Sequence, residues 1–197
     1  MTSTRTRLLE AAQKLIEEGG YGAATVAAIA DGAGVAAGTL YRHFASKEEL
    51  FVEVFRLVCD REVVAMGAAA EAMPDGSPCV DRLEMVLGTF ADRALRRPRL
   101  AWALIAEPVD PLVDAERLAY RERYSVLCAA TLRQGIAAGE LPDQNVELVA
   151  AALVGGCGEA LVGPLSPVAG RKPGREEVVA ALRLFVRRAV GAAEASS

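Results

Sequence analysis

The chain has 197 residues, a formal net charge of −4, and a composition that is 52% hydrophobic and 5% aromatic. This hydrophobic content permits a sizeable core and excludes a disordered chain. The negative charge excludes a protein that binds nucleic acid over its whole surface, so any DNA binding must come from local charge. Helix-forming residues are abundant and alternating runs of Val, Ile and Thr are missing, which predicts an all-α fold.

Several classes of site are absent from the sequence. The four cysteines are widely spaced along the chain: Cys59, Cys79, Cys128 and Cys157. No C-x-x-C pair occurs and the single histidine lies elsewhere, so we expect no metal and no cofactor. Without a G-x-S-x-G motif or a P-loop, we also expect no enzyme activity. No signal-peptide pattern opens the chain, and Glu159 with two prolines interrupts the apolar stretch 148–169, so we expect a cytoplasmic protein without a membrane helix.

The first 45 residues predict three helices, at about 3–18, 25–32 and 36–43. Gly19 and Gly20 end the first helix, and Thr25 is the N-cap of the second. The turn Ala33-Gly34-Val35 separates the second helix from the third. Two short helices joined by a glycine turn form a helix-turn-helix, whose second helix can enter a DNA major groove.

The rest of the chain predicts six longer helical segments. Ser46 and Glu49 form a capping box, S-x-x-E, that opens a fourth helix reaching about residue 73. Loops rich in proline and glycine then separate five more helices. We predict these helices at 79–96, 98–107, 112–138, 144–162 and 175–192. The chain therefore divides into a head, residues 1–48, and a body, residues 49–197, with the fourth helix linking the two.

The segment 25–47 reads TVAAIADGAGVAAGTLYRHFASK. The positions Ile29-Ala30, Ala33-Gly34-Val35, Gly38-Thr39-Leu40-Tyr41, His43-Phe44 and Ser46-Lys47-Glu48 closely resemble the tetracycline-repressor (TetR) family in order and spacing. The resemblance covers about the first 55 residues. It implies a three-helix DNA-binding head and a roughly six-helix body for effector binding and dimerisation. It also implies a homodimer that binds palindromic operator DNA and releases it when a small molecule binds the body.

The residues that we expect to contact DNA lie in and around the third helix. They are Thr25, Ala36, Ala37, Thr39, Tyr41, Arg42, His43 and Lys47. Tyr41 can lay its ring on a sugar and its hydroxyl on a phosphate, unless it packs in the core, and Thr39 resembles the family's small hydroxyl contact. We expect Arg42 to face DNA and His43 to bridge backbone and phosphate. Lys47 lies at the positive end of a helix dipole, where a phosphate would compensate its charge.

Ala36 and Ala37 depart from the family pattern, which often has a polar residue at one or both positions. Two alanines cannot hydrogen-bond a base edge through their side chains. We therefore predict that DNA shape and phosphate contacts matter more than usual here. Residues 1–47 hold five basic and four acidic side chains, including Asp31. This thin positive charge leaves an alternative open, a ligand-binding or protein-interaction module that no longer binds DNA.

In the body we predict effector contacts from Trp102, Glu107, Tyr120, Arg121 and Tyr124. Tyr120 and Tyr124 are four residues apart and share one helix face. Glu107 ends an apolar helix, where it could select a cation or a hydroxyl, or form a structural pair with an arginine. The alternative for the aromatic residues is plain core packing. The apolar body favours a hydrophobic or amphipathic effector, which would act by moving the fourth helix.

Glycines Gly155, Gly156 and Gly158 lie inside a predicted apolar helix, where each costs about 1 kcal/mol relative to alanine. Close approach of another helix would compensate this cost. We therefore predict a homodimer through the 144–162 and 175–192 helices, which would form a four-helix bundle across a two-fold axis. The alternative is packing within one chain.

Overall fold

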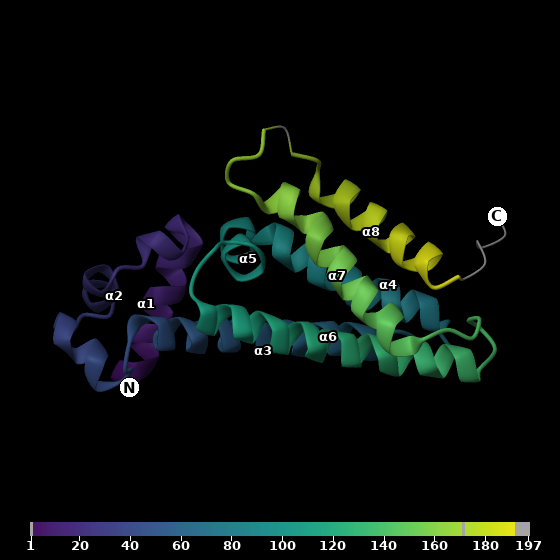
Figure 1. Cartoon of the computed structure of the whole chain (residues 1–197), viewed down its shortest axis with the longest axis horizontal. Helices are drawn as coiled ribbons and strands as arrows, with labels where there is room; N and C mark the ends of the chain where they lie inside the picture. The colour runs from purple at the N-terminus through teal and green to yellow at the C-terminus, as the bar shows by residue number, and fades with distance from the viewer. Residues whose placement is uncertain (1, 171, 192–197) are drawn as a thin grey trace.

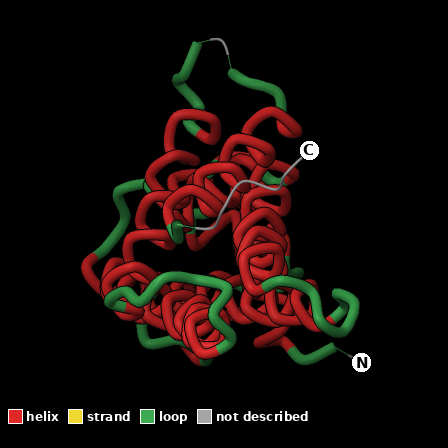
Figure 2. The backbone as a smooth tube through the Cα atoms, turned by 90° about the vertical axis from the view of Figure 1, so that its right-hand side faces the viewer, coloured by secondary structure: helices red, strands yellow, loops and turns green. Residues whose placement is uncertain are grey.

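The computed structural model describes residues 2–170 and 172–191. These residues form eight α-helices and two 3-10 helices, with no β-strand among them, which confirms the all-α prediction. Figure 1 shows a small head of short helices at one end and an elongated body of longer helices beside it. Viewed after a turn of 90°, the body helices stack in more than one layer (Figure 2).

The head contains two α-helices and two 3-10 helices: α1 (Thr4–Gly19), η1 (Tyr21–Ala23), α2 (Val26–Gly32) and η2 (Ala37–Arg42). Thr25 is the N-cap of α2, as predicted, because its hydroxyl accepts a hydrogen bond from the backbone N–H of Ala28 at 3.2 Å. Gly34 has a φ of +65°, which lets the N–H of Val35 return to the carbonyl of Ala30 at 2.9 Å. This glycine turn sets the direction of the segment that follows.

The third helix, η2, is a 3-10 helix and not the α-helix that a recognition helix usually is. A segment of six residues gains little from α-helical propagation, and short pieces commonly take the tighter form. Side chains three apart then lie on the same face. Leu40 is fully buried and anchors η2 to the head core. Tyr41 is exposed on a second face, while Thr39 and Arg42 share the third.

The body contains six α-helices: α3 (Lys47–Glu71), α4 (Cys79–Arg96), α5 (Pro98–Ile105), α6 (Pro111–Ala137), α7 (Val146–Leu165) and α8 (Arg175–Ala189). Every predicted helix is present, with bounds that agree within a few residues; residue 192 of the last predicted range lies outside the described residues. At the start of α3 the hydroxyl of Ser46 accepts from the Glu49 N–H at 3.1 Å, and the Glu49 carboxylate accepts from the N–H of Ala45. Ser46 is therefore the N-cap of α3, as predicted, whereas Glu49 accepts from the residue before the N-cap and not from the Ser46 N–H of a standard capping box.

Helix α3 runs from the head into the body, where it lies alongside α6 (Figure 1). Leu50 and Phe55 on α3 are buried near the head, and Met66 is buried towards the far end of the body. The short helix α5 lies against both α1 of the head and α7 of the body. Head and body therefore meet along two elements, the continuous helix α3 and the short helix α5.

Helix α7 has an unusual distribution of apolar side chains. Among the described residues it is the one helix with the length and composition that a membrane span would need, with a mean hydropathy of 1.7, and a third of that window is buried inside the chain. The buried residues form one stripe: Ala150, Leu153, Cys157, Leu161 and Leu165. Outside this stripe Leu148 is 67% exposed. The helix thus has one packed face and one apolar face that the chain itself leaves uncovered.

Candidate functional site

The predicted DNA-contacting residues gather on the surface of the head. Six of them are exposed: Thr25, Ala36, Ala37, Tyr41, Arg42 and His43. Tyr41 is 57% exposed although its neighbour Leu40 is fully buried, so Tyr41 is not a core residue. Thr39 is half-buried beside them. The arrangement presents an aromatic hydroxyl and a guanidinium on adjacent faces of η2.

Cationic side chains near this surface differ in how they are held. The Arg5 side chain is held by contacts within the protein. It forms an ion pair with Glu53 at 3.0 Å and lies 5.0 Å from the centre of the Phe44 ring. Among the described residues, the side chains of Arg42 and His43 have no hydrogen-bond or ion-pair partner. These two residues are therefore free to meet phosphate oxygens.

Lys47 has a partner that the sequence did not reveal. Its Nζ lies 4.6 Å from the centre of the Tyr21 ring and 5.3 Å from that of Phe51. Such cation–π contacts compensate a lysine at the positive end of a helix, so the chain itself supplies what a phosphate was expected to supply. Burial, with Glu48 and Asp110 nearby, raises the pKa of Tyr21 to about 12. The ring beneath Lys47 therefore stays neutral.

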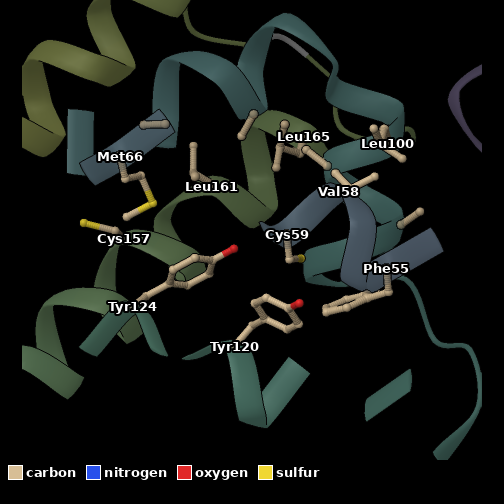
Figure 3. Close-up of a cluster of buried hydrophobic side chains, with 14 of the residues drawn as sticks. Phe55, Val58, Cys59, Met66, Leu100, Tyr120, Tyr124, Cys157, Leu161 and Leu165 are labelled. Carbon is tan, nitrogen blue, oxygen red and sulfur yellow. The ribbon is translucent and has the colours of Figure 1, made fainter. Parts of the chain in front are cut away.

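A cavity of about 100 Å³ lies in the middle of the body, between α3, α4, α5, α6 and α7. Figure 3 shows part of its wall, in which Phe55 and Cys59 come from α3, Tyr120 and Tyr124 from α6, and Cys157 from α7. Further apolar side chains complete the lining: Val58, Met66, Leu87, Phe90, Leu100, Leu104, Ile105 and Val154. A space of this kind holds an apolar group and excludes a hydrated one.

The cavity brings together three of the five predicted effector residues, Tyr120, Arg121 and Tyr124. The Tyr120 hydroxyl donates to Asp60 Oδ1 at 2.7 Å, and the Tyr120 ring packs edge-on against Phe55 with centroids 5.6 Å apart. Burial raises the pKa of Tyr124 above its usual range and that of Cys59 to about 12, so both groups are neutral at physiological pH. The part of the wall that these tyrosines and Cys59 form is therefore uncharged.

The other two predicted residues, Trp102 and Glu107, do not line the cavity. The Glu107 carboxylate accepts a hydrogen bond from the backbone N–H of Tyr21 at 3.1 Å, so it faces the head. Its partner is a backbone amide, and not the ligand group or the arginine that we had considered. The sequence showed that Glu107 ends an apolar helix but not which neighbour that helix end meets.

Two arginines reinforce the same junction between head and body. Arg99 donates to the carbonyl of Gly19 at 2.8 Å, and Arg97 pairs with Glu17 at 2.5 Å. Both acceptors lie at the C-terminal end of α1. Arg97 and Arg99 flank the start of α5, and Glu107 follows its end. Polar contacts therefore tie both ends of α5 to the head.

Arg117 joins this junction to the cavity. It lines the cavity from α6, and its side chain is 13% exposed. Its guanidinium donates to the carbonyls of Ala103 at 2.8 Å, Leu104 at 2.9 Å and Glu107 at 2.5 Å. These carbonyls lie at the C-terminal end of α5, which otherwise lacks hydrogen-bond partners there. Arg117 thus fixes the end of the helix that carries Glu107.

Sequence reasoning missed the contribution of α3 to the cavity. The residues concerned are Phe55, Val58, Cys59, Glu62 and Met66. Their spacing of three or four residues marks one face of a helix, so a signal was present in the sequence. It did not distinguish a cavity wall from ordinary core, because both produce the same apolar stripe.

Comparison with known proteins agrees with this architecture. Residues 8–54 match the family model described as "Bacterial regulatory proteins, tetR family". The chain is 34% identical over 155 residues to the HTH-type transcriptional repressor KstR2 of Rhodococcus jostii, covering 73% of this chain and 71% of the relative. KstR2 of Mycobacterium tuberculosis is 32% identical over 162 residues, covering 76% and 75%. Among solved structures, the regulator FadR of Bacillus subtilis in complex with stearoyl-CoA has the same fold, with a TM-score of 0.76, 20% identity, and coverage of 96% and 99%.

Proposed function

This chain belongs to the TetR family of bacterial regulatory proteins and is a ligand-responsive transcriptional regulator of the repressor type, and we propose how its residues perform that function. The head, residues 1–48, binds operator DNA, and the body, residues 49–197, binds the effector and forms the dimer. One structural relationship carries the proposal. The head exposes the surface of η2, and polar contacts join this head to α5, a helix that lines the apolar cavity.

In the proposed DNA complex, η2 enters the major groove and the residues around it hold the phosphates. Tyr41, Thr39 and Arg42 lie on the two faces of η2 that are not anchored to the head core. Arg42 adds positive charge next to the groove and His43 adds an imidazole, and neither side chain has a hydrogen-bond or ion-pair partner among the described residues. The Lys47 ammonium makes cation–π contacts with the rings of Tyr21 and Phe51, and its N–H donors can still hydrogen-bond a phosphate. Ala36 and Ala37 offer only methyl contacts, so DNA shape contributes much of the selectivity.

A homodimer would present two such heads to a palindromic operator on one face of the DNA. We propose that α7 and α8 form its interface. The uncovered apolar face of α7 and the exposed side chains Leu184 and Phe185 of α8, at 44% and 41% exposure, support this assignment. Gly156 faces the Phe185 ring so closely that an added Cβ would lie 3.1 Å from it. Gly156 therefore lets α8 approach α7 closely within the chain, and Gly155, which has no neighbour within 4 Å of an added Cβ, leaves room for a helix of a second copy.

We propose that the effector acts on the head through α5 as well as through α3. The cavity of about 100 Å³ is smaller than the several hundred Å³ of a typical ligand pocket, so an effector must displace part of the wall. Helix α5 is the shortest helix of that wall, with eight residues. Because both of its ends bind the head, its displacement would pull on α1 and η1 and reorient η2.

The energies involved are of the right size for a switch. Moving a two-state population from 1:99 to 99:1 takes about 5.5 kcal/mol of differential binding. The charge-assisted hydrogen bond that Arg99 donates to Gly19 and the one that Glu107 accepts from Tyr21 each contribute about 1.5–3 kcal/mol. The half-exposed Arg97–Glu17 pair contributes about 1 kcal/mol or less. The free energy lost when these contacts break is therefore comparable to the differential binding energy that the switch requires.

Retention of DNA by the purified protein tests this function. The probes are duplexes of intergenic DNA from the neighbourhood of the protein's own gene, measured by fluorescence anisotropy at low salt. Specific retention of one duplex, with a steep decrease as salt is raised, is the expected result. Failure to retain any duplex more tightly than random DNA would favour the alternative, a ligand-binding or protein-interaction module without DNA binding.

A further inference from the structure

Charged side chains are few on the wall of the cavity, and they are mostly cationic. The lining contains four arginines and one acidic residue: Arg93, Arg97, Arg117, Arg121 and Glu62. A guanidinium beside an apolar space is stabilised either by an acceptor of the protein or by an anionic group of a ligand. The partners of the four arginines therefore indicate which charge, if any, the cavity leaves for a ligand.

Three of the four guanidiniums already have protein partners. Arg93 forms a two-pronged pair with Glu62, with N–O distances of 2.6 and 2.9 Å. Arg97 pairs with Glu17 at 2.5 Å. Arg117 pairs with Asp114 at 2.5 Å and also donates to three backbone carbonyls. Each of these three arginines is thus balanced by one carboxylate.

Arg121 is the exception. Among residues 2–170 and 172–191 its guanidinium has no hydrogen-bond, ion-pair or ring partner. It lies one helical turn after Arg117 and next to Tyr120, and it is exposed while still lining the cavity. An exposed lining residue lies where the cavity opens to solvent. The opening of this apolar cavity therefore carries one unbalanced positive charge.

We infer that the effector has an apolar body and a single acidic head group, a carboxylate, which binds the Arg121 guanidinium while the body enters the cavity. Arg121 is then the residue that determines specificity for this chemical class. The planar guanidinium can bind a carboxylate through two parallel hydrogen bonds, which fixes the orientation of the ligand as well as its charge. The inference rests on the proposed function in that it takes the cavity to be the effector site.

The charge balance favours one acidic group over several. Glu62, Glu17 and Asp114 already hold the other three arginines of the lining. A head group with several phosphates would bring additional negative charge close to these carboxylates without a free cation to receive it. A head group with one negative charge matches the one guanidinium that remains.

Titration of straight-chain ligands from six to twelve carbons tests this inference without DNA. The probes are the carboxylates, the primary alcohols and the primary amines of each length, together with the coenzyme A thioesters as polyanionic probes. Trp102, the one tryptophan of the chain, lies on α5, a helix with other residues that line the cavity, and reports binding by its fluorescence. At least one carboxylate should bind, and roughly ten- to hundredfold more tightly than its alcohol.

The variants separate a direct contact from a general effect of charge. Arg121→Gln should weaken carboxylate binding roughly ten- to hundredfold and leave alcohol binding unchanged, and Arg121→Lys should restore part of the loss. Arg61→Gln is the matched control, because Arg61 is exposed on α3, has no partner among the described residues and does not line the cavity. Since the Arg121 guanidinium has no hydrogen-bond, ion-pair or ring partner among the described residues, its variants should keep the wild-type unfolding midpoint.

Several outcomes would overturn the inference. They are the absence of binding for every carboxylate, equal binding of the alcohols or amines, equal losses in Arg121→Gln and Arg61→Gln, or tighter binding of the thioesters that does not depend on Arg121. DNA retention by the ligand-free protein is measured in parallel. Retention without carboxylate binding would reject this inference alone, whereas carboxylate binding without DNA retention would reject the regulatory function and leave the ligand class standing.

Discussion

The Glu107 carboxylate accepts a hydrogen bond from the backbone N–H of Tyr21, which lies 86 positions earlier in the chain. Tyr21 follows the C-terminal end of α1 in the head, and Glu107 follows the end of α5 in the body. The carbonyl of the same Glu107 accepts from Arg117, which lines the cavity. One residue therefore contacts both the DNA-binding head and a side chain of the cavity wall.

Replacing Glu107 with alanine should loosen the head from the body. We expect the free energy of unfolding to fall by about 1.5–3 kcal/mol, because a charge-assisted hydrogen bond is lost at a half-buried site. DNA affinity without effector should fall by up to about tenfold, the equivalent of about 1.4 kcal/mol, because the head is less firmly oriented. Urea unfolding and fluorescence anisotropy measure the two effects.

Glu122→Ala is the control for this variant, since Glu122 is exposed on α6 and has no side-chain partner among the described residues. If Glu107→Ala kept both the DNA affinity and the full response to effector, the contact between Glu107 and Tyr21 would not transmit the signal.

Replacing Tyr41 with alanine should abolish DNA retention while leaving the fold and the dimer intact. The side chain is 57% exposed on η2, so its removal leaves no cavity in the head core. The loss of its ring and hydroxyl removes the contact that we propose with the DNA backbone. Anisotropy with operator DNA, thermal unfolding and light scattering measure the three properties. A variant that still retained DNA normally would exclude Tyr41 from the interface.

Most of the fold could be predicted because its signals are local. Gly20 and Gly34 have positive φ where the first helix ends and where the head turns, and Thr25 and Ser46 cap the helices that follow them. Such residues act on their own neighbours, so a single sequence reveals them. The 3-10 form of η2 is different, because it depends on how a short segment docks through Leu40 onto the rest of the head.

The candidate site could be predicted only in part. Tyr120 and Tyr124 share one face of α6, as the helical repeat predicts, and Arg121 lines the same cavity from an exposed position next to Tyr120. Trp102 lies on α5, and Glu107 follows the end of that helix. The rotation of α5 about its own axis is set by its packing against α1 and α7. That rotation is a property of the tertiary structure, so the sequence could not show that Glu107 faces the head.

The proposed dimer interface predicts a selective effect of charge on α8. Leu184→Glu would place a carboxylate in an apolar interface, where burial without a partner is costly, and should raise the dimer dissociation constant at least tenfold. Leu118→Glu is the control, since Leu118 is 66% exposed on α6, outside the proposed interface. Sedimentation at micromolar concentrations measures the dissociation constants. Equal effects of the two substitutions, or a wild-type chain that is already monomeric, would contradict the interface.

Alkaline pH should destabilise the fold through its buried thiols. Burial raises the pKa of the Cys128 thiol from an ordinary value of 9.0 to about 12. A group whose pKa is higher in the folded state contributes full stability below its unfolded pKa and loses it as the pH rises towards the folded pKa. Between pH 9 and about 11, Cys128 should therefore lower the free energy of unfolding by up to about 1.4 kcal/mol per pH unit.

The slope against pH, and not the absolute stability, isolates this contribution. Cys128→Ala leaves a small void and should be less stable at every pH, but its stability should fall less steeply above pH 9. Cys128 does not line the cavity, so the comparison is independent of ligand binding. Urea unfolding at intervals from pH 7.5 to 10.5 supplies the two slopes. Parallel curves would mean that water reaches Cys128 before the chain unfolds, and that this part of the body opens locally.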